Sequence, residues 1–551
     1  MQGERLYRAR KLYLAERMYE EAVKQARLMG KYNFHLGVSL DGLGKTFVAQ
    51  KEYDRARPFY QEALQVLQNA LKVSKNELDR RLLMEDTARV CADLADTYLA
   101  EKKYAEAAPL YLKCVSLSKG CNTGAGSTPR DNLVGQNEAL SLYKLGVMAQ
   151  RERKFSDAEN YYKQALATAN ASSSPAAIVE RMMDGCSEAL RAQGREQEAE
   201  DVYITRKWLA YTAAALEEYE GNNLRAAEAL HKKALSEAEK LGSQDLHVSI
   251  SLQNLATIYA GLDELPQAED AAVKALEIRQ TGISAEKLLT LLGELYMQTG
   301  RYREAEPILL RLISARQRKW GQDNIRVGDA VAHLALAYQR DGKADLAKEQ
   351  AARAFKIYQP QCSKKSQFTT AQRELATTLL LLRDLDHAAI MNEQLVAMLT
   401  GDSVWQGRLS AAYLQLACIY REQHKEAQAK YASARARQLF NNIKPGWKVL
   451  EPVRVEFDLG SFYDQAGRPS EARQCYEKAV SDLESAEIAG RRANLLAATC
   501  LRQYAEFLKR EGQIGACRHI EQLAAAHDSY KPLPPGIRNH LAEPPVKTMP
   551  R

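Results

Sequence analysis

Apolar and small residues recur along the chain with one fixed spacing. In residues 252–276, a Leu-Ala pair is followed by an aromatic residue three positions after the alanine, by an alanine at +12, and by apolar residues at +16 and +19. Residues 288–312 repeat this spacing with a Leu-Gly pair. Apolar residues three and four positions apart lie on one face of a helix. Each copy of the spacing therefore predicts two helices joined by a short turn.

The turn and the second helix of each copy carry signals of their own. Tetrapeptides such as QTGR at 298–301 separate the two helices, because Gly adopts positive φ at no steric cost. The alanine at +12 begins the second helix, and its small size permits a close approach to the small residue of the first. Pro58, Pro109 and Pro307 each lie two residues after this alanine. A proline in the first turn of a helix loses little, because its N–H would have no partner there.

Copies of the spacing cover the chain from about residue 2 to residue 528. Thirteen alanines fit the +12 position: Ala22, Ala56, Ala107, Ala158, Ala199, Ala227, Ala268, Ala305, Ala347, Ala388, Ala429, Ala472 and Ala516. One hairpin cannot bury both of its apolar faces, but stacked hairpins bury them continuously. The sequence therefore predicts an all-α solenoid of about 12–13 helical hairpins.

The spacing of these residues resembles that of tetratricopeptide repeats. The alanines from 305 to 429 are 41 or 42 residues apart, longer than the 34 of the standard repeat. This length, together with the segment EAEPILLRLI at 304–313, resembles the repeats of kinesin light chains. The resemblance implies a right-handed superhelix whose first helices form a concave groove. It also implies that the groove binds peptide segments of other proteins.

Breaks in the spacing predict how the chain is divided. The step from Ala199 to Ala227 is only 28 residues, so we interpret 204–212 as a junction, with one irregular continuous array as the alternative. This interpretation gives an N-terminal array over 1–206 and a C-terminal array over 207–528. Residues 529–551 are rich in proline, and we expect a disordered tail there.

Two further stretches of the N-terminal array depart from the regular spacing. Residues 119–131 are rich in Gly, Ser and Thr, and predict a mobile loop. Residues 61–90 contain no helix breaker and predict one long helix.

The composition favours a protein without catalytic or nucleic-acid chemistry. Lys and Arg number 77 and Asp and Glu number 70, a net charge of +7 with no basic run. Nine Cys without a C-x-x-C pair predict buried thiols in a reducing, cytoplasmic compartment. The first residues lack the apolar segment of a signal peptide, and the apolar runs are too short to span a bilayer. We expect no enzyme activity, metal, cofactor, nucleic acid or membrane insertion.

One motif competes with this interpretation. Residues 37–47 end in the tripeptide GKT, as a phosphate-binding loop does. Such a loop needs a Gly where the chain has Ser39, and it needs a preceding strand. The repeat spacing instead makes Gly44 a small residue of a first helix, with Tyr60 at +16. We therefore expect Gly44 to pack against a helix and Lys45 to be solvated or to face the groove.

Residues facing the predicted groove can be located by position. They should lie at −3, −2, +1, +4 and +5 from the small residue of each first helix. In the most regular block these positions hold Gln253, Asn254, Thr257, Thr290, Glu294, His333, Arg340, Arg373, Gln415 and Arg421. Amide side chains suit the backbone of an extended peptide, and the resemblance to kinesin light chains implies this role for Asn254. Arginines grip carboxylates bidentately, so we expect acidic or acid-flanked segments as partners.

Three classes of function remain open at this point. The leading hypothesis is a non-enzymatic scaffold that binds partner proteins in the groove. The second is a regulatory protein whose groove is occupied by its own tail, which the prolines of 529–551 suggest. The third and least favoured is a nucleotide-dependent switch.

Overall fold

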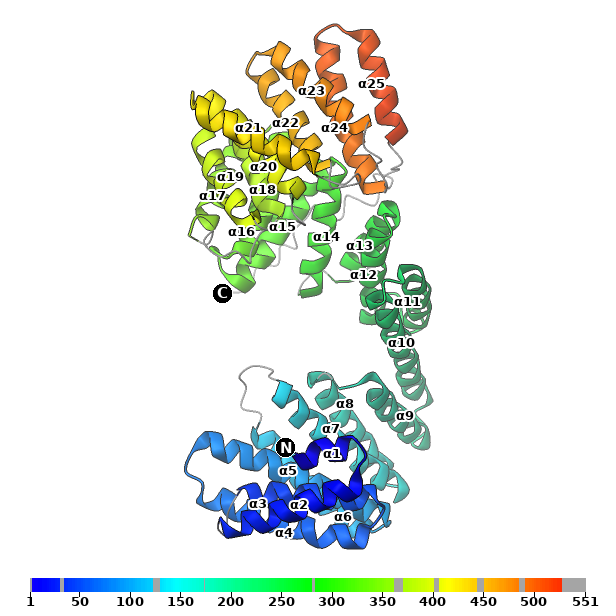
Figure 1. Cartoon of the computed structure of the whole chain (residues 1–551). Coiled ribbons are helices and arrows are strands. Elements are labelled where there is room, and N and C mark those ends of the chain that lie inside the picture. The colour runs from blue at the N-terminus through cyan, green and yellow to red at the C-terminus, as the bar shows by residue number, and fades with distance from the viewer. Residues whose placement is uncertain are drawn as a thin grey trace, which may run out of the picture. The chain divides into compact units, whose positions relative to one another are not determined.

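The computed structural model describes residues 2–29, 34–121, 129–172, 174–279, 283–360, 370–400, 406–442, 450–484 and 491–527. Within these ranges the chain forms 25 α-helices and no strand, so the all-α prediction is confirmed. The helices divide between two compact units (Figure 1). Unit 1 comprises Met1–Leu216 and Ser236–Leu241, and unit 2 comprises Glu217–Leu235 and Gly242–Arg551.

The helices follow one another in chain order, and most consecutive helices pack against each other. The first ten are α1 Gln2–Arg8, α2 Leu12–Leu28, α3 Phe34–Ala49, α4 Tyr53–Val73, α5 Glu77–Ala100, α6 Tyr104–Cys121, α7 Pro129–Arg151, α8 Phe155–Ala171, α9 Ala176–Ala192 and α10 Glu196–Glu220. The next eight are α11 Leu224–Glu239, α12 Leu246–Gly261, α13 Leu265–Ile278, α14 Ile283–Gln298, α15 Tyr302–Trp320, α16 Ile325–Arg340, α17 Ala344–Tyr358 and α18 Thr370–Leu381. The last seven are α19 Leu385–Leu399, α20 Gln406–Glu422, α21 Glu426–Asn441, α22 Leu450–Gln465, α23 Pro469–Glu484, α24 Arg491–Arg510 and α25 Ile514–His527.

Each hairpin turn contains one residue with left-handed backbone, seven positions after the small residue. These residues have φ between 55° and 80°: Arg10, Lys51, Lys102, Arg153, Gly194, Asn222, Asp263, Gly300, Gly342, Arg383, His424, Gly467 and Gly512. The N–H of the next residue donates to a carbonyl five residues back, as Lys103 does to Tyr98 at 2.9 Å. This bond closes the first helix in the Schellman pattern. In the described part of the chain, the thirteen turns therefore mark thirteen copies of the repeat.

The long helix α10 explains why thirteen copies contain 25 helices. It carries Ala199, the +12 residue of one copy, and also Ala215, the small residue of the next. Residues 204–212, interpreted above as a junction, lie inside this helix. The boundary between the two units falls between Leu216 and Glu217, near its end.

The small residue of the first helix lies against the side chain at +16. A Cβ added to Gly44 would lie 2.7 Å from the ring of Tyr60, and one added to Gly460 would lie 2.6 Å from the ring of Tyr476. Real Cβ atoms do not approach a neighbour this closely, so an alanine at either position would force the tyrosine ring to shift. The packing role predicted for Gly44 is confirmed.

Two of the thirteen predicted +12 alanines are wrong. The eleven from 56 to 472 are at most 4% exposed, but Ala22 is only half-buried and Ala516 is exposed. The residues at that position are Ala15 and Cys517, which are buried. Both errors fall in the first and last copies, where only one side has a neighbouring copy to fix the register.

Two further predictions for the N-terminal array concern the helix at 61–90 and the loop at 119–131. The single helix predicted over 61–90 is wrong, because α4 ends at Val73 and α5 begins at Glu77. Asn76 caps α5 by accepting a hydrogen bond from the Leu78 N–H at 3.0 Å. Of the loop predicted at 119–131, residues 122–128 lie outside the described residues, and so does the predicted tail at 529–551.

Gly44→Ala should destabilise the α3–α4 hairpin by about 1–3 kcal/mol, because the added methyl group would overlap the Tyr60 ring. Gly515→Ala in α25 is the matched control, since nothing lies within 4 Å of its added methyl group. The control should be neutral or stabilising by up to ~1 kcal/mol through helix propensity. Urea unfolding followed by circular dichroism measures both changes, and hydrogen exchange assigns them to a hairpin. Equal effects would contradict the packing role of Gly44.

The left-handed turn residues give a second prediction. Lys102 has a φ of 62° and is exposed, so Lys102→Gly should relieve backbone strain and stabilise unit 1 by up to ~1 kcal/mol. Gly342 has a φ of 80° and nothing within 4 Å of an added Cβ, so Gly342→Ala should cost about 1 kcal/mol through the backbone alone. Thermal unfolding of the two variants should shift in opposite directions. Shifts of the same sign would argue against a turn held by backbone conformation.

Candidate functional site

Unit 2 contains a chamber of about 1190 Å³. Side chains from α12, α14, α15, α16, α18, α20, α22 and α24 line it. Many of these residues lie at −3, −2, +1, +4 or +5 from the small residue of a first helix. The inner faces of the first helices therefore build the chamber.

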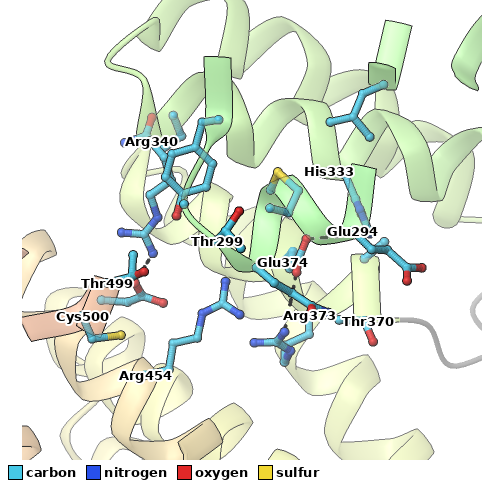
Figure 2. A pocket seen from close by; sticks show the side chains of 18 of the residues that line it. Glu294, Thr299, His333, Arg340, Thr370, Arg373, Glu374, Arg454, Thr499 and Cys500 are labelled. Atoms are coloured by element: carbon cyan, nitrogen blue, oxygen red, sulfur yellow. Dashed lines mark hydrogen bonds and ion pairs between the residues drawn. The ribbon is translucent and has the colours of Figure 1, made fainter. Parts of the chain in front are cut away.

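The chamber is closed by contacts between helices that are far apart in the sequence. Arg340, at the end of α16, forms an ion pair with Asp458 of α22, 118 residues away. Another terminal nitrogen of Arg340 lies 3.5 Å from the Gln503 side-chain oxygen in α24. A Cβ added to Gly300, just after α14, would lie 3.2 Å from a carbon of Thr499 in α24. Helices α14 and α16 thus meet α22 and α24, as Figure 2 shows for Arg340 and Thr499.

Asp458 of this ion pair is buried and Arg340 is only slightly exposed. The side chain of Arg340 is 14% exposed and that of Asp458 is 3% exposed. Burial lowers the pKa of the Arg340 guanidinium, but the Asp458 carboxylate raises it more, so the pKa stays above its ordinary value. Burial also raises the pKa of the nearby Cys500 thiol to about 12. Cys500 is therefore a neutral wall residue at physiological pH and not a nucleophile.

A second wall of the chamber is formed by α18, in which every residue from Ala371 to Leu381 is buried. Arg373 and Glu374 lie side by side on it (Figure 2), at 7% and 6% exposure. One Glu374 oxygen lies 3.7 Å from an Arg373 nitrogen. The other lies 3.8 Å from Nε2 of His333 in α16, and it is buried without a hydrogen bond. This wall therefore carries a carboxylate whose nearest cations are beyond hydrogen-bonding distance.

Half of the groove residues predicted from the sequence line this chamber. They are Thr290, Glu294, His333, Arg340 and Arg373. Two of the arginines already have partners within the unit, namely Asp458 for Arg340 and Glu374 for Arg373.

The other five predicted residues do not line the chamber. In α12, Gln253 and Asn254 are half-buried and Thr257 is exposed. Gln415 in α20 is 1% exposed and donates to Thr377 of α18 at 2.8 Å, because α18 and α20 pack against each other. Arg421 is exposed, with a nitrogen 3.5 Å from the Tyr463 hydroxyl.

Sequence analysis did not single out several charged residues that also line the chamber. Glu374 and Asp458 lie at −2 from their small residues, Arg502 at −3 and Glu506 at +1. The positional rule that gave the predicted groove contained all four. No local signal distinguished them from solvated residues of other copies.

The tripeptide GKT belongs to unit 1 and lies inside α3. The Lys45 ammonium lies 2.8 Å from Asp41 and 3.2 Å from Asp93, and its side chain is 27% exposed. Lys45 is therefore engaged by two carboxylates and is not a solvated lysine. Burial, opposed by Lys45, raises the pKa of Asp93 to about 7. A helix at this position excludes the loop that a phosphate-binding motif requires.

Two further observations concern metal binding and membrane insertion. No group of three or more His, Cys, Asp or Glu side chains among them could hold a metal ion. None of the described helices combines the length and the apolar character needed to cross a membrane.

Stacked hairpins with a constant spacing and a constant turn define a helical-repeat protein. Tetratricopeptide repeat families match residues 3–69, 88–121, 141–176, 288–319 and 456–481. These segments of the chain are therefore similar to tetratricopeptide repeats. A crystal structure of a tetratricopeptide repeat protein from Parabacteroides merdae is 15% identical to it, over 58% of this chain and 99% of that one, with a TM-score of 0.35. No curated protein matches the chain.

Asp458→Asn should destabilise unit 2 by about 3–5 kcal/mol, because it leaves the largely buried Arg340 without its counterion. Arg340→Met should cost a similar amount, and the double variant should cost less than the sum of the two. Urea unfolding gives the energies, and hydrogen exchange in α16, α22 and α24 shows where protection is lost. Simple additivity of the two single changes would mean that the ion pair does not hold these helices together.

Proposed function

We propose that this chain is a non-enzymatic scaffold and that the chamber of unit 2 receives a segment of a partner protein. The observation that carries this proposal is the convergence of polar and charged side chains from eight helices on about 1190 Å³. Small-molecule sites commonly have about 300–1,000 Å³. A larger chamber suits several side chains of a peptide.

The charges of the chamber favour a segment with its own charged side chains. Six arginines and six carboxylates line the chamber. The arginines are Arg316, Arg340, Arg373, Arg408, Arg454 and Arg502. Guanidinium groups bind carboxylates bidentately, which supports acidic or acid-flanked segments as ligands. The equal number of carboxylates disfavours a polyanion such as nucleic acid, whose binding needs a surplus of positive charge.

Two finer features stay predictions. The 41- or 42-residue steps between the +12 alanines of α15, α17, α19 and α21 support repeats of the kinesin light chain type. The eight cysteines among the described residues form no disulfide with one another, which supports a reducing, cytoplasmic location.

The alternative functions have less support. Occupation of the chamber by the chain's own tail stays a prediction, because residues 529–551 lie outside the described residues. The only sequence support for a nucleotide-dependent switch was the tripeptide GKT. Its Lys45 lies inside a helix and pairs with Asp41 and Asp93, so the tripeptide does not form a phosphate-binding loop.

Narrowing the chamber should block the segment. Gln298, at the end of α14, lines the chamber and is exposed, so Gln298→Trp adds bulk without disturbing the core. Peptides selected from a displayed library on the wild-type chain should bind this variant at least about tenfold more weakly, a difference of ~1.4 kcal/mol. Gln428→Trp, at an exposed position of α21 outside the chamber, is the matched control and should bind as the wild type does. Isothermal titration calorimetry measures the affinities.

The two tryptophan variants together decide the location of the site. Equal binding by wild type and Gln298→Trp would exclude the chamber as the peptide site and make the outer helix faces the better candidates. Circular dichroism of each variant checks that the helices are intact.

A further inference from the structure

Glu374 is a buried carboxylate that faces the chamber without a hydrogen bond. The residue is 6% exposed, and its Oε2 is buried without a hydrogen bond from the described residues. A buried acceptor left without a donor is destabilising, and more so when it is charged. An added donor would remove this destabilisation at Glu374.

The nearest cations within the unit satisfy Glu374 only in part. Arg373 precedes it on α18 and approaches to 3.7 Å, and His333 of α16 approaches to 3.8 Å. Both distances exceed that of a charge-assisted hydrogen bond, which is about 2.7–2.9 Å. In Figure 2, Glu294 of α14 lies on the same side of the chamber as His333, and its carboxylate adds negative charge there.

The other arginines that line the chamber already have interactions within the unit. Arg340 is paired with Asp458. Arg316 donates to the Arg326 carbonyl at 2.7 Å and to the Thr290 hydroxyl at 3.0 Å. Arg408, Arg454 and Arg502 each have an interaction as well. Each of these arginines thus has an interaction, although Nε of Arg316 and of Arg340 is buried without a hydrogen bond. Of the two buried carboxylate residues that line the chamber, Glu374 and Asp458, only Glu374 has a buried oxygen that accepts no hydrogen bond from the described residues.

From this asymmetry we infer that Glu374 binds a cationic group, an ammonium or a guanidinium, of the segment that enters the chamber. The inference rests on the proposed function and deepens it, because it names the charge of one side chain of the ligand. A lysine ammonium offers three N–H donors and an arginine guanidinium five, so either group satisfies the carboxylate and keeps donors for Glu294. An acid-flanked basic residue therefore fits both walls of the chamber.

The probes are four pentapeptides, acetyl-Gly-Ser-Xaa-Ser-Gly-amide, in which Xaa is Lys, Arg, Gln or Glu. Imidazole C–H signals of His333 in the full chain, assigned with a His333→Gln variant, report occupation next to Glu374. The Lys and Arg peptides should bind the wild type at least about tenfold more tightly than the Gln and Glu peptides, a difference of ~1.4 kcal/mol. Glu374→Gln should abolish this preference, and Glu374→Asp should keep part of it. Glu426→Gln, which changes an exposed carboxylate of α21 outside the chamber, should leave the preference intact.

Each outcome decides the inference. Equal binding of the Lys and Gln peptides to the wild type, as expected when His333 and Arg373 already satisfy Glu374, overturns it. A preference that persists in Glu374→Gln overturns it too. If Glu374→Gln does not fold, the wild-type preference and its partial retention in Glu374→Asp still decide. The library peptides test the proposed function separately. If they bind the wild type but not Gln298→Trp, the proposed function stands even when the preference for cationic pentapeptides is absent.

Discussion

The whole architecture depends on one close contact within each hairpin. Small residues lie on the first helix and at +12, and where the small residue is Gly it lies against the side chain at +16. At Gly44 and Gly460 an added Cβ would lie within 2.7 Å of a tyrosine ring. This contact sets the distance between the two helices, and the left-handed residue at +7 sets the reversal between them. Each hairpin then presents the same two faces to its neighbours, so copies stack by repeating one geometry.

This contact is also what made the fold predictable from the sequence. The residues that make this contact are close together in the chain and recur many times. Their spacing can therefore be recognised without knowledge of the tertiary structure. The turns were harder to see, because eight of the thirteen left-handed residues are not Gly. Arg10 and Lys51 carry no sequence signal of a turn. Their left-handed conformation is visible only in the structure, from their positive φ and from the hydrogen bond that the next residue donates to a carbonyl five residues back. The break before α5 depends on the side chain of Asn76, a single capping residue in an otherwise helical pattern.

The candidate site was predictable only as far as it is periodic. The inner-face positions of first helices followed from the repeat, and many residues of the chamber occupy them. Which inner residues meet across the chamber depends on how small rotations add up over several hairpins. Arg340 and its partner Asp458 are 118 residues apart, so no local sequence pattern predicts that they form an ion pair. Gln415 was expected in an open groove for the same reason, although the packing of α20 on α18 buries it.

The two walls of the chamber show two solutions to burying charge. At Arg340 and Asp458, opposite charges from distant helices meet, and the ion pair adds to the contacts that close the unit. At Glu374 the carboxylate is equally buried, but Arg373 and His333 stay beyond hydrogen-bonding distance. A fold selected for stability alone would place an apolar residue there, because replacing buried ionic groups by well-packed apolar ones is often stabilising. An acidic side chain in that position carries a cost that the proposed cationic ligand would remove. The imbalance between the two walls therefore favours binding over stability as the role of this surface.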